Sequence, residues 1–164
     1  MSENTMPELT VGQYAEVRRH VSQSDVLAFV EVVGDENPIH RDAAFARRTR
    51  FGAPIAPGLF TAGLISAIIG TELPGPGTIY LSQSLRFLKP VRIGDTITAR
   101  VEVVELLAGR NRVRLRTVCT NEAGDEVLSG EAWVAAPAAA PGAGRAVRAG
   151  VVDQALAVER GMAS

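Results

Sequence analysis

The segment Gly58–Ile69 reads GLFTAGLISAII and contains no charged residue. Its composition predicts a helix that is apolar nearly all round, and such a helix must be covered by other structure. Gly70 marks its end, and Pro74–Gly77 is a turn region. Because the segment is too short to span a bilayer, we interpret it as the buried centre of one domain.

The sequence on both sides of this helix alternates between apolar and polar residues. In Thr96–Val103, for example, the residues from Ile97 onward alternate between small or branched apolar side chains and polar ones. This period of two is typical of strands with one buried and one wet face. The pattern predicts an α+β fold in which a curved antiparallel sheet wraps around the one long apolar helix. The expected strands are Tyr14–Val21, Ile79–Phe87, Thr96–Val103, Arg112–Thr120 and Val127–Val134.

A short loop before the apolar helix carries a carboxylate and an imidazole. Ser22 and Asp25 have the spacing of an N-terminal cap, for a helix that ends at Gly34. The loop Asp35–His40 follows, and its Asn-Pro step favours a turn with restricted backbone freedom. A carboxylate and an imidazole held together can move protons near neutral pH. We therefore predict that Asp35 and His40 form an acid–base pair.

The composition indicates a single globular domain. The chain has 164 residues, of which 46% are hydrophobic, and a net charge of −1, so one folded core is expected. We place that domain at residues 1–135. Residues 136–164, which begin with a stretch rich in Ala, Pro and Gly, form a tail by composition, with a short helix expected over 151–160.

The charge balance narrows the kinds of partner that we expect, and the cysteine content narrows the cellular compartment. The balanced charge gives no reason to expect nucleic acid or a membrane surface. Cys119 is the single cysteine and cannot form an internal disulfide, and the first residues lack the pattern of an export signal, so we expect a cytoplasmic protein. Two distant histidines and one cysteine have no known metal-site spacing, so no metal is expected.

Three motifs carry a resemblance to a known family. They are Gly34–His40 (GDENPIH), Pro54–Leu59 (PIAPGL) and Leu73–Phe87 (LPGPGTIYLSQSLRF), continued by Lys89–Val91 and Ile93–Asp95. Over roughly residues 11–134 the chain resembles the MaoC-like dehydratases of the hot-dog fold, most closely the (R)-specific enoyl-CoA hydratases.

The resemblance implies a reaction and a set of site residues. The reaction is reversible addition of water to a trans-2-enoyl-CoA, giving a (R)-3-hydroxyacyl-CoA. Asp35 and His40 match the catalytic pair, Asn37 the residue that braces their loop, Gly58 the glycine whose N–H meets the thioester carbonyl, and Ser66 a helix serine that supports the pair. The resemblance also implies a homodimer, an acyl-CoA thioester as substrate and no dissociable cofactor. Pro57 departs from the histidine that many relatives carry there, which affects the lining of the pocket.

The same residues also allow other interpretations. By spacing alone, Asp35 is more often a turn residue and His40 an exposed loop residue; the resemblance reverses that order. Gly58 could simply begin a helix, and Ser66 could be a back-bonded core serine. A 3-hydroxyacyl-ACP dehydratase shares the chemistry, since both carriers use the same arm. A hot-dog acyl-CoA thioesterase is disfavoured because Gly58–Ile69 holds no carboxylate, and a non-catalytic acyl-thioester-binding subunit because both members of the pair are present.

Overall fold

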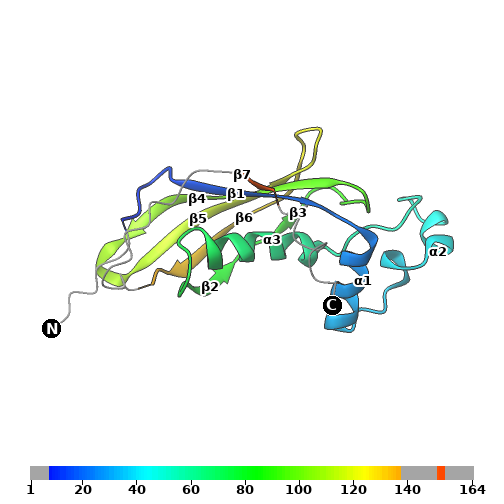
Figure 1. The fold of residues 1–164 in the computed structure, drawn as a ribbon, viewed down its shortest axis with the longest axis horizontal. Coiled ribbons are helices and arrows are strands. Elements are labelled where there is room, and N and C mark those ends of the chain that lie inside the picture. The colour runs from blue at the N-terminus through cyan, green and yellow to red at the C-terminus, as the bar shows by residue number, and fades with distance from the viewer. Residues whose placement is uncertain (1–7, 138–150, 154–164) are drawn as a thin grey trace, which may run out of the picture.

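The computed structural model describes residues 8–137 and 151–153. A long curved sheet covers one side of helix α3 (Gly58–Thr71), and the smaller helices α1 (Gln23–Val33) and α2 (Ala43–Arg47) lie together at one end of the sheet (Figure 1). This arrangement confirms the α+β fold with a curved antiparallel sheet and one long central helix. Among the described residues, no helix is long and apolar enough to cross a membrane.

The sheet follows the order β2-β6-β5-β4-β1-β7, with β3 also beside β6. All neighbours are antiparallel except β1 and β7, which are parallel. The strands are β1 (Tyr14–His20), β2 (Ile79–Gln83), β3 (Arg86–Phe87), β4 (Thr96–Leu107), β5 (Arg112–Thr120), β6 (Glu126–Ala135) and β7 (Val151–Asp153). The short helix expected over 151–160 is wrong for residues 151–153, which form β7, and its remainder lies outside the described residues.

The strand expected over Ile79–Phe87 is divided into β2 and β3 by a bend at Ser84. The Ser84 N–H donates to the Glu131 carbonyl at 2.9 Å, and the Ser84 carbonyl lies against Gly130. A Cβ atom on residue 130 would lie 1.9 Å from that oxygen. Only glycine therefore allows the segment between β2 and β3 to approach β6 this closely. The bend brings Phe87 back toward α3.

The concave face of the sheet packs on α3 and forms the core. Ile65, Ile68 and Ile69 of α3 are buried, against alternating inward residues of β4 and β5 such as Val101 and Leu115, which are fully buried. Since these side chains recur with period two on the strands, the buried face follows the sequence pattern. The opposite face of α3, with Gly63, Ser66, Ala67 and Gly70, is exposed, so one chain covers this apolar helix on one side only.

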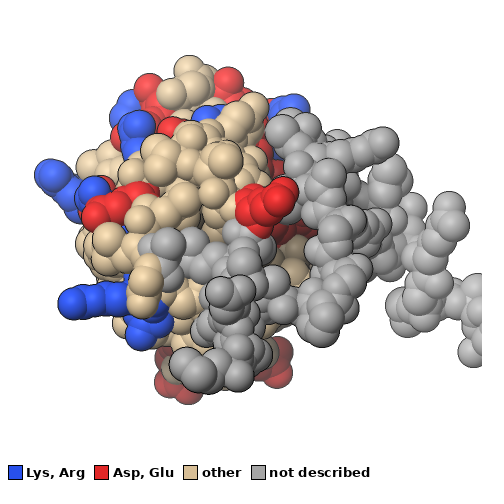
Figure 2. All heavy atoms as spheres, turned by 90° about the vertical axis from the view of Figure 1, so that its left-hand side faces the viewer, with Lys and Arg blue, Asp and Glu red and all other residues tan. Residues whose placement is uncertain are grey.

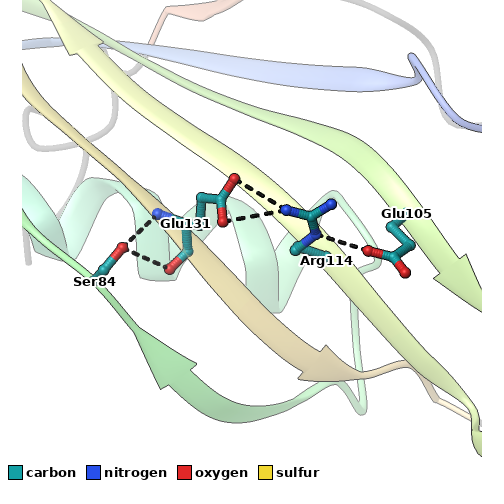
Figure 3. A network of polar contacts seen from close by, with 4 residues as sticks. All are labelled: Ser84, Glu105, Arg114 and Glu131. Atoms are coloured by element: carbon teal, nitrogen blue, oxygen red, sulfur yellow. Dashed lines mark hydrogen bonds and ion pairs between the residues drawn. The ribbon is translucent and has the colours of Figure 1, made fainter.

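The outer face of the sheet is polar. Arg114 donates from Nε to Glu105 at 2.9 Å and from Nη1 to Glu131 at 3.3 Å, and the Glu131 backbone is held by Ser84 (Figure 3). At the end of the molecule opposite α1 and α2, acidic and basic side chains are interspersed (Figure 2). The wet side of the strands therefore carries mixed charge, as their alternating sequence predicts.

Candidate active site

Helix α1 fixes the position of Asp35. Ser22 and Asp25 form the predicted capping box at its start, with the Asp25 N–H donating to Ser22 Oγ at 3.1 Å. At its end Gly34 has φ of 71°, a left-handed conformation that suits glycine. The Asp35 N–H then donates to the Val30 carbonyl at 2.8 Å. The carboxylate is therefore tied to a helix end whose two boundaries are encoded locally.

A short turn carries the chain from Asp35 to His40. The Asn37 N–H donates to Asp35 Oδ1 at 2.9 Å, and Asn37 Oδ1 accepts from the Ile39 N–H at 3.2 Å. Pro38 begins the single 3₁₀ turn η1 (Pro38–His40), as its fixed φ favours. The predicted bracing by Asn37 thus has a definite form: its backbone orients the carboxylate, and its side chain caps the turn that presents His40.

The His40 ring faces Asp35 with one nitrogen and is anchored through the other. His40 Nδ1 lies 2.7 Å from the Ile55 carbonyl oxygen, and His40 Nε2 lies 3.6 Å from Asp35 Oδ2. A carbonyl can only accept, so Nδ1 carries a proton, and in the neutral ring Nε2 holds the free lone pair. The side chains of His40 and Asp35 are 11% and 33% exposed, which leaves the space between them reachable by water.

The Ile55 carbonyl links this pair to the start of α3. The Ile55 N–H donates to the Ile39 carbonyl at 3.3 Å, and the next residue, Ala56, donates to the Val91 carbonyl at 2.8 Å. The segment is thus fixed on both sides just before Pro57, the N-cap of α3. Pro57 offers no capping side chain, so the first N–H groups of α3 point outward without a side-chain acceptor. Gly58 is the first of them, and it is exposed.

A cavity of about 410 Å³ opens at Gly58. Ile55, Thr61, Phe87 and Leu128 are among its lining residues. The Phe87 ring packs directly on Gly58, where any Cβ atom would lie 2.5 Å from Phe87 Cε1. With the Phe87 ring in this position, only glycine fits here, so a larger residue would require the ring to move. The volume lies within the range of small-molecule sites.

Two cationic side chains also line this cavity. Lys89 is paired with Asp125 at 2.8 Å. Arg50 lies over the Phe51 ring, with its guanidinium carbon 4.8 Å from the ring centroid, and is exposed. Among the described residues Arg50 has no carboxylate within ion-pair distance, so its charge is available to a ligand at the cavity.

The structure brings together most, but not all, of the site residues that the sequence predicts. Asp35, Asn37 and His40 form one hydrogen-bonded loop, joined to Gly58 through Ile55. Ser66 lies further along α3 on its exposed face, and in the described part of the chain it makes no hydrogen bond to the pair. Sequence reasoning missed Ile55, because its contribution is a backbone carbonyl that no side-chain pattern reports.

Comparisons with known proteins agree with this architecture. Residues 7–124 match the family described as MaoC like domain. A 3-hydroxybutyryl-CoA dehydratase of Methylorubrum extorquens is 54% identical over 131 residues, which cover 79% of this chain and 82% of the relative. An (R)-specific enoyl-CoA hydratase of Rhodospirillum rubrum is 47% identical over 131 residues, covering 80% and 90%. The solved structure of an unliganded R-hydratase of Pseudomonas aeruginosa is similar with a TM-score of 0.78 and 48% identity, covering 82% of this chain and 88% of that one.

The curved sheet on a central helix, with Asp35 and His40 facing each other beside the segment before that helix, defines a hot-dog protein. Within that class, the chain belongs to the MaoC-like dehydratase family.

Proposed function

We propose that this protein is a hydro-lyase that reversibly adds water to a trans-2-enoyl-CoA and forms a (R)-3-hydroxyacyl-CoA. The observation that carries this proposal is the 3.6 Å separation of Asp35 Oδ2 and His40 Nε2, on a loop fixed to the segment that leads into α3. The relatives at 54% and 47% identity are named 3-hydroxybutyryl-CoA dehydratase and (R)-specific enoyl-CoA hydratase. Dehydration and hydration are the two directions of this one reaction.

The Asp35 and His40 side chains hold and activate the water. In the neutral ring, His40 Nε2 accepts a hydrogen bond, as do both carboxylate oxygens of Asp35. One water molecule donates a proton toward each of the two facing acceptors, and its oxygen is then directed at the β-carbon of the enoyl group. Between them, Asp35 and His40 take the water proton and return one to the α-carbon. Because Asp35 Oδ1 accepts the hydrogen bond from the Asn37 N–H, Oδ2 is the oxygen that faces this water.

The start of α3 stabilises the charge that this reaction develops. As water adds to the β-carbon, an enolate forms and negative charge collects on the thioester carbonyl oxygen. The Gly58 N–H and the positive end of the helix dipole are suited to that charge. Acid–base groups and a charge-stabilising site are sufficient for hydration, so the proposed reaction requires no cofactor.

The test is to incubate the purified protein with crotonyl-CoA, and to follow the ultraviolet absorbance of the enoyl group and the release of free thiol in parallel. We expect loss of the enoyl absorbance, no release of CoA thiol, and a 3-hydroxybutyryl product that is (R) by chiral chromatography. Release of thiol without hydration would instead support an acyl-CoA thioesterase. Binding without any turnover would support a non-catalytic acyl-thioester-binding subunit.

The site geometry favours hydration over thioester hydrolysis. Helix α3 carries no carboxylate along Gly58–Thr71, and Glu72 is its C-cap, at the end away from Gly58. The acid of the proposed mechanism comes instead from the loop after α1. A 3-hydroxyacyl-ACP dehydratase would use the same groups, and the carrier is distinguished by comparing crotonyl-CoA with crotonyl-ACP as substrates.

We also propose that the protein is a homodimer joined through the β2 edge of its sheet. Within the described residues β2 is an edge strand, and its Ile79 and Leu81 are 60% and 46% exposed. A strand edge with apolar side chains favours pairing with another strand. Leu59 at the start of α3 is 61% exposed, and the face of this helix that the sheet leaves uncovered is uncharged. A second copy at this edge would cover these surfaces by a two-fold arrangement.

Two further assignments stay predictions. A supporting role for Ser66 is tested by Ser66→Ala, which should lower turnover if the hydroxyl acts on the pair in the assembled protein. A cytoplasmic location is supported by the single cysteine, Cys119, which is a buried free thiol and suits a reducing compartment. Localisation of a tagged full-length chain tests it.

A further inference from the structure

Among the described residues, two polar side chains are buried, and both are threonines. Thr61 on α3 is 1% exposed and Thr117 on β5 is fully buried. Thr117 Oγ1 accepts a hydrogen bond from Gln83 Nε2 at 3.0 Å. Within that same part of the chain, Thr61 Oγ1 has no hydrogen-bond partner. A buried hydroxyl without a partner lowers stability, so its retention calls for an explanation.

Thr61 stands one helical turn after Gly58. Side chains on a helix lean toward its N-terminus, so a residue covers the turn that precedes it. Thr61 therefore lies over the turn that begins at Gly58, and both residues line the same cavity. The usual internal partner for a helical threonine is the carbonyl four residues earlier. The Pro57 carbonyl accepts from the Phe60 N–H at 3.0 Å, and the Thr61 hydroxyl makes no hydrogen bond to it.

The surroundings of Thr61 supply no other partner. The neighbouring cavity walls include Phe87, Val91 and Leu128, which have no polar side-chain atoms. Cys119 Sγ is 3.9 Å from the Thr61 backbone oxygen and makes its contact there, not with the hydroxyl. Burial raises the pKa of the Cys119 thiol to about 12, so this group stays protonated and does not act as a base. Within the described residues, therefore, neither the cavity wall nor Cys119 pairs with the Thr61 hydroxyl.

We propose that Thr61 Oγ–H is a second hydrogen-bond donor, beside the Gly58 N–H, to the thioester carbonyl oxygen of the bound substrate. This inference rests on the hydratase function proposed above. The hydroxyl is unpaired in the free protein because its partner is the oxygen on which charge develops. Donors of this kind are effective because they are already positioned before the charge forms. Thr61 would then be a catalytic residue drawn from the same helical turn as Gly58.

The test uses two substitutions at Thr61 and one matched control. Thr61→Val keeps the shape and removes the hydroxyl, Thr61→Ser keeps the hydroxyl, and Thr117→Val removes a buried hydroxyl that has a partner. With crotonyl-CoA, we expect Thr61→Val to lower kcat by roughly 10²-fold, as loss of one such donor does. The loss should fall on kcat more than on KM, because the charge is greatest in the transition state. Thr61→Ser should restore most of the rate.

Thermal unfolding separates this role from a structural one. Thr61→Val should unfold at the same temperature as the wild type or higher, since it removes an unpaired buried group. Thr117→Val should unfold at a lower temperature and keep its kcat. Thr61→Ala repeats the measurement with a smaller side chain, in case valine disturbs packing. If the wild type is active and a folded Thr61→Val or Thr61→Ala variant keeps the wild-type kcat, this inference is overturned and the proposed function is not. A wild-type protein that hydrates no enoyl-CoA would overturn the proposed function and this inference with it.

Discussion

Two arginines, Arg48 and Arg50, each stack on a nearby phenylalanine ring, but only Arg50 lines the cavity at Gly58. Arg50 stacks on Phe51 and lines the cavity at Gly58. Arg48 stacks on Phe45, 5.9 Å from the ring centroid, and is not among the residues that line this cavity. Coenzyme A carries several phosphate charges, and arginine binds phosphate through paired N–H groups. We therefore expect Arg50 to contact the phosphates of the substrate and Arg48 not to do so.

This difference predicts a selective change in KM. Arg50→Gln should raise KM for crotonyl-CoA by roughly tenfold, as the loss of one charged hydrogen bond does, and should leave KM for crotonyl-pantetheine, which lacks the phosphates, unchanged. Arg48→Gln should change neither value. Steady-state kinetics with both substrates measures this. An equal rise for both substrates would place Arg50 at the acyl or pantetheine part instead.

The site also shows which residue positions can be predicted from sequence. Asp35 and His40 meet because a short loop with Asn37 and Pro38 closes on itself, and those signals are local. The anchor for His40 is a different case, because the Ile55 carbonyl reaches it through backbone contacts between separate segments. Likewise nothing in the sequence distinguishes the unpaired Thr61 from a back-bonded helical threonine. Ser66 falls on the exposed side of its helix, which depends on where the sheet packs.

At the scale of elements, the start of α1 is held by charge as well as by capping. Burial tends to raise the pKa of Asp25, but hydrogen bonds with Ser22 and the nearby Arg19 outweigh it and hold this pKa below its usual value of 3.8. Arg19 Nη2 lies 2.7 Å from Asp25 Oδ1. Because the folded-state pKa is the lower one, this stability is present above the unfolded value and is lost as pH falls through the folded value.

Asp25→Asn should therefore lower the free energy of unfolding by about 1 kcal/mol at neutral pH, the usual size of a cap contribution. Its difference from the wild type should shrink as the pH falls from about 5 toward 3. Urea unfolding across this pH range measures the effect. Glu31→Gln, an exposed change on the same helix, is the control and should have little effect. A difference that stays constant with pH would mean that the charge of Asp25 contributes nothing.

The strands show a similar division between local and distant causes. Strands form in every region where the alternating pattern predicts one, because that pattern depends only on the residues of the strand itself. The break between β2 and β3 was not predicted, because it depends on the absence of a Cβ atom at Gly130 of β6, which lets the Ser84 carbonyl approach closely. Similarly, the apolar sequence of α3 predicted full coverage, whereas one chain covers a single side. The uncovered face of α3 is a surface that a second copy of the chain would cover in the proposed dimer.

At the scale of the whole molecule, the proposed dimer has a direct test. The wild-type protein should have twice its chain mass of 17.3 kDa by light scattering at micromolar concentration. An Ile79→Lys/Leu81→Lys double variant should shift toward the single-chain mass, because charges on an edge strand oppose pairing. Val32→Lys on α1, where the side chain is 86% exposed, is the matched control and should stay dimeric. A monomeric wild type at this concentration would refute the proposal.

In the proposed mechanism, Asp35 and His40 together activate one water molecule beside the start of α3. The most direct test of this mechanism is the rate of crotonyl-CoA hydration by the wild type, Asp35→Asn and Glu36→Gln, with thermal unfolding of each. Glu36 is the adjacent exposed carboxylate, so its variant controls for charge in the loop. We predict that Asp35→Asn lowers kcat by about 10²- to 10⁴-fold with its unfolding temperature unchanged, while Glu36→Gln keeps the wild-type rate. A folded Asp35→Asn protein that hydrates crotonyl-CoA at the wild-type rate would contradict the account.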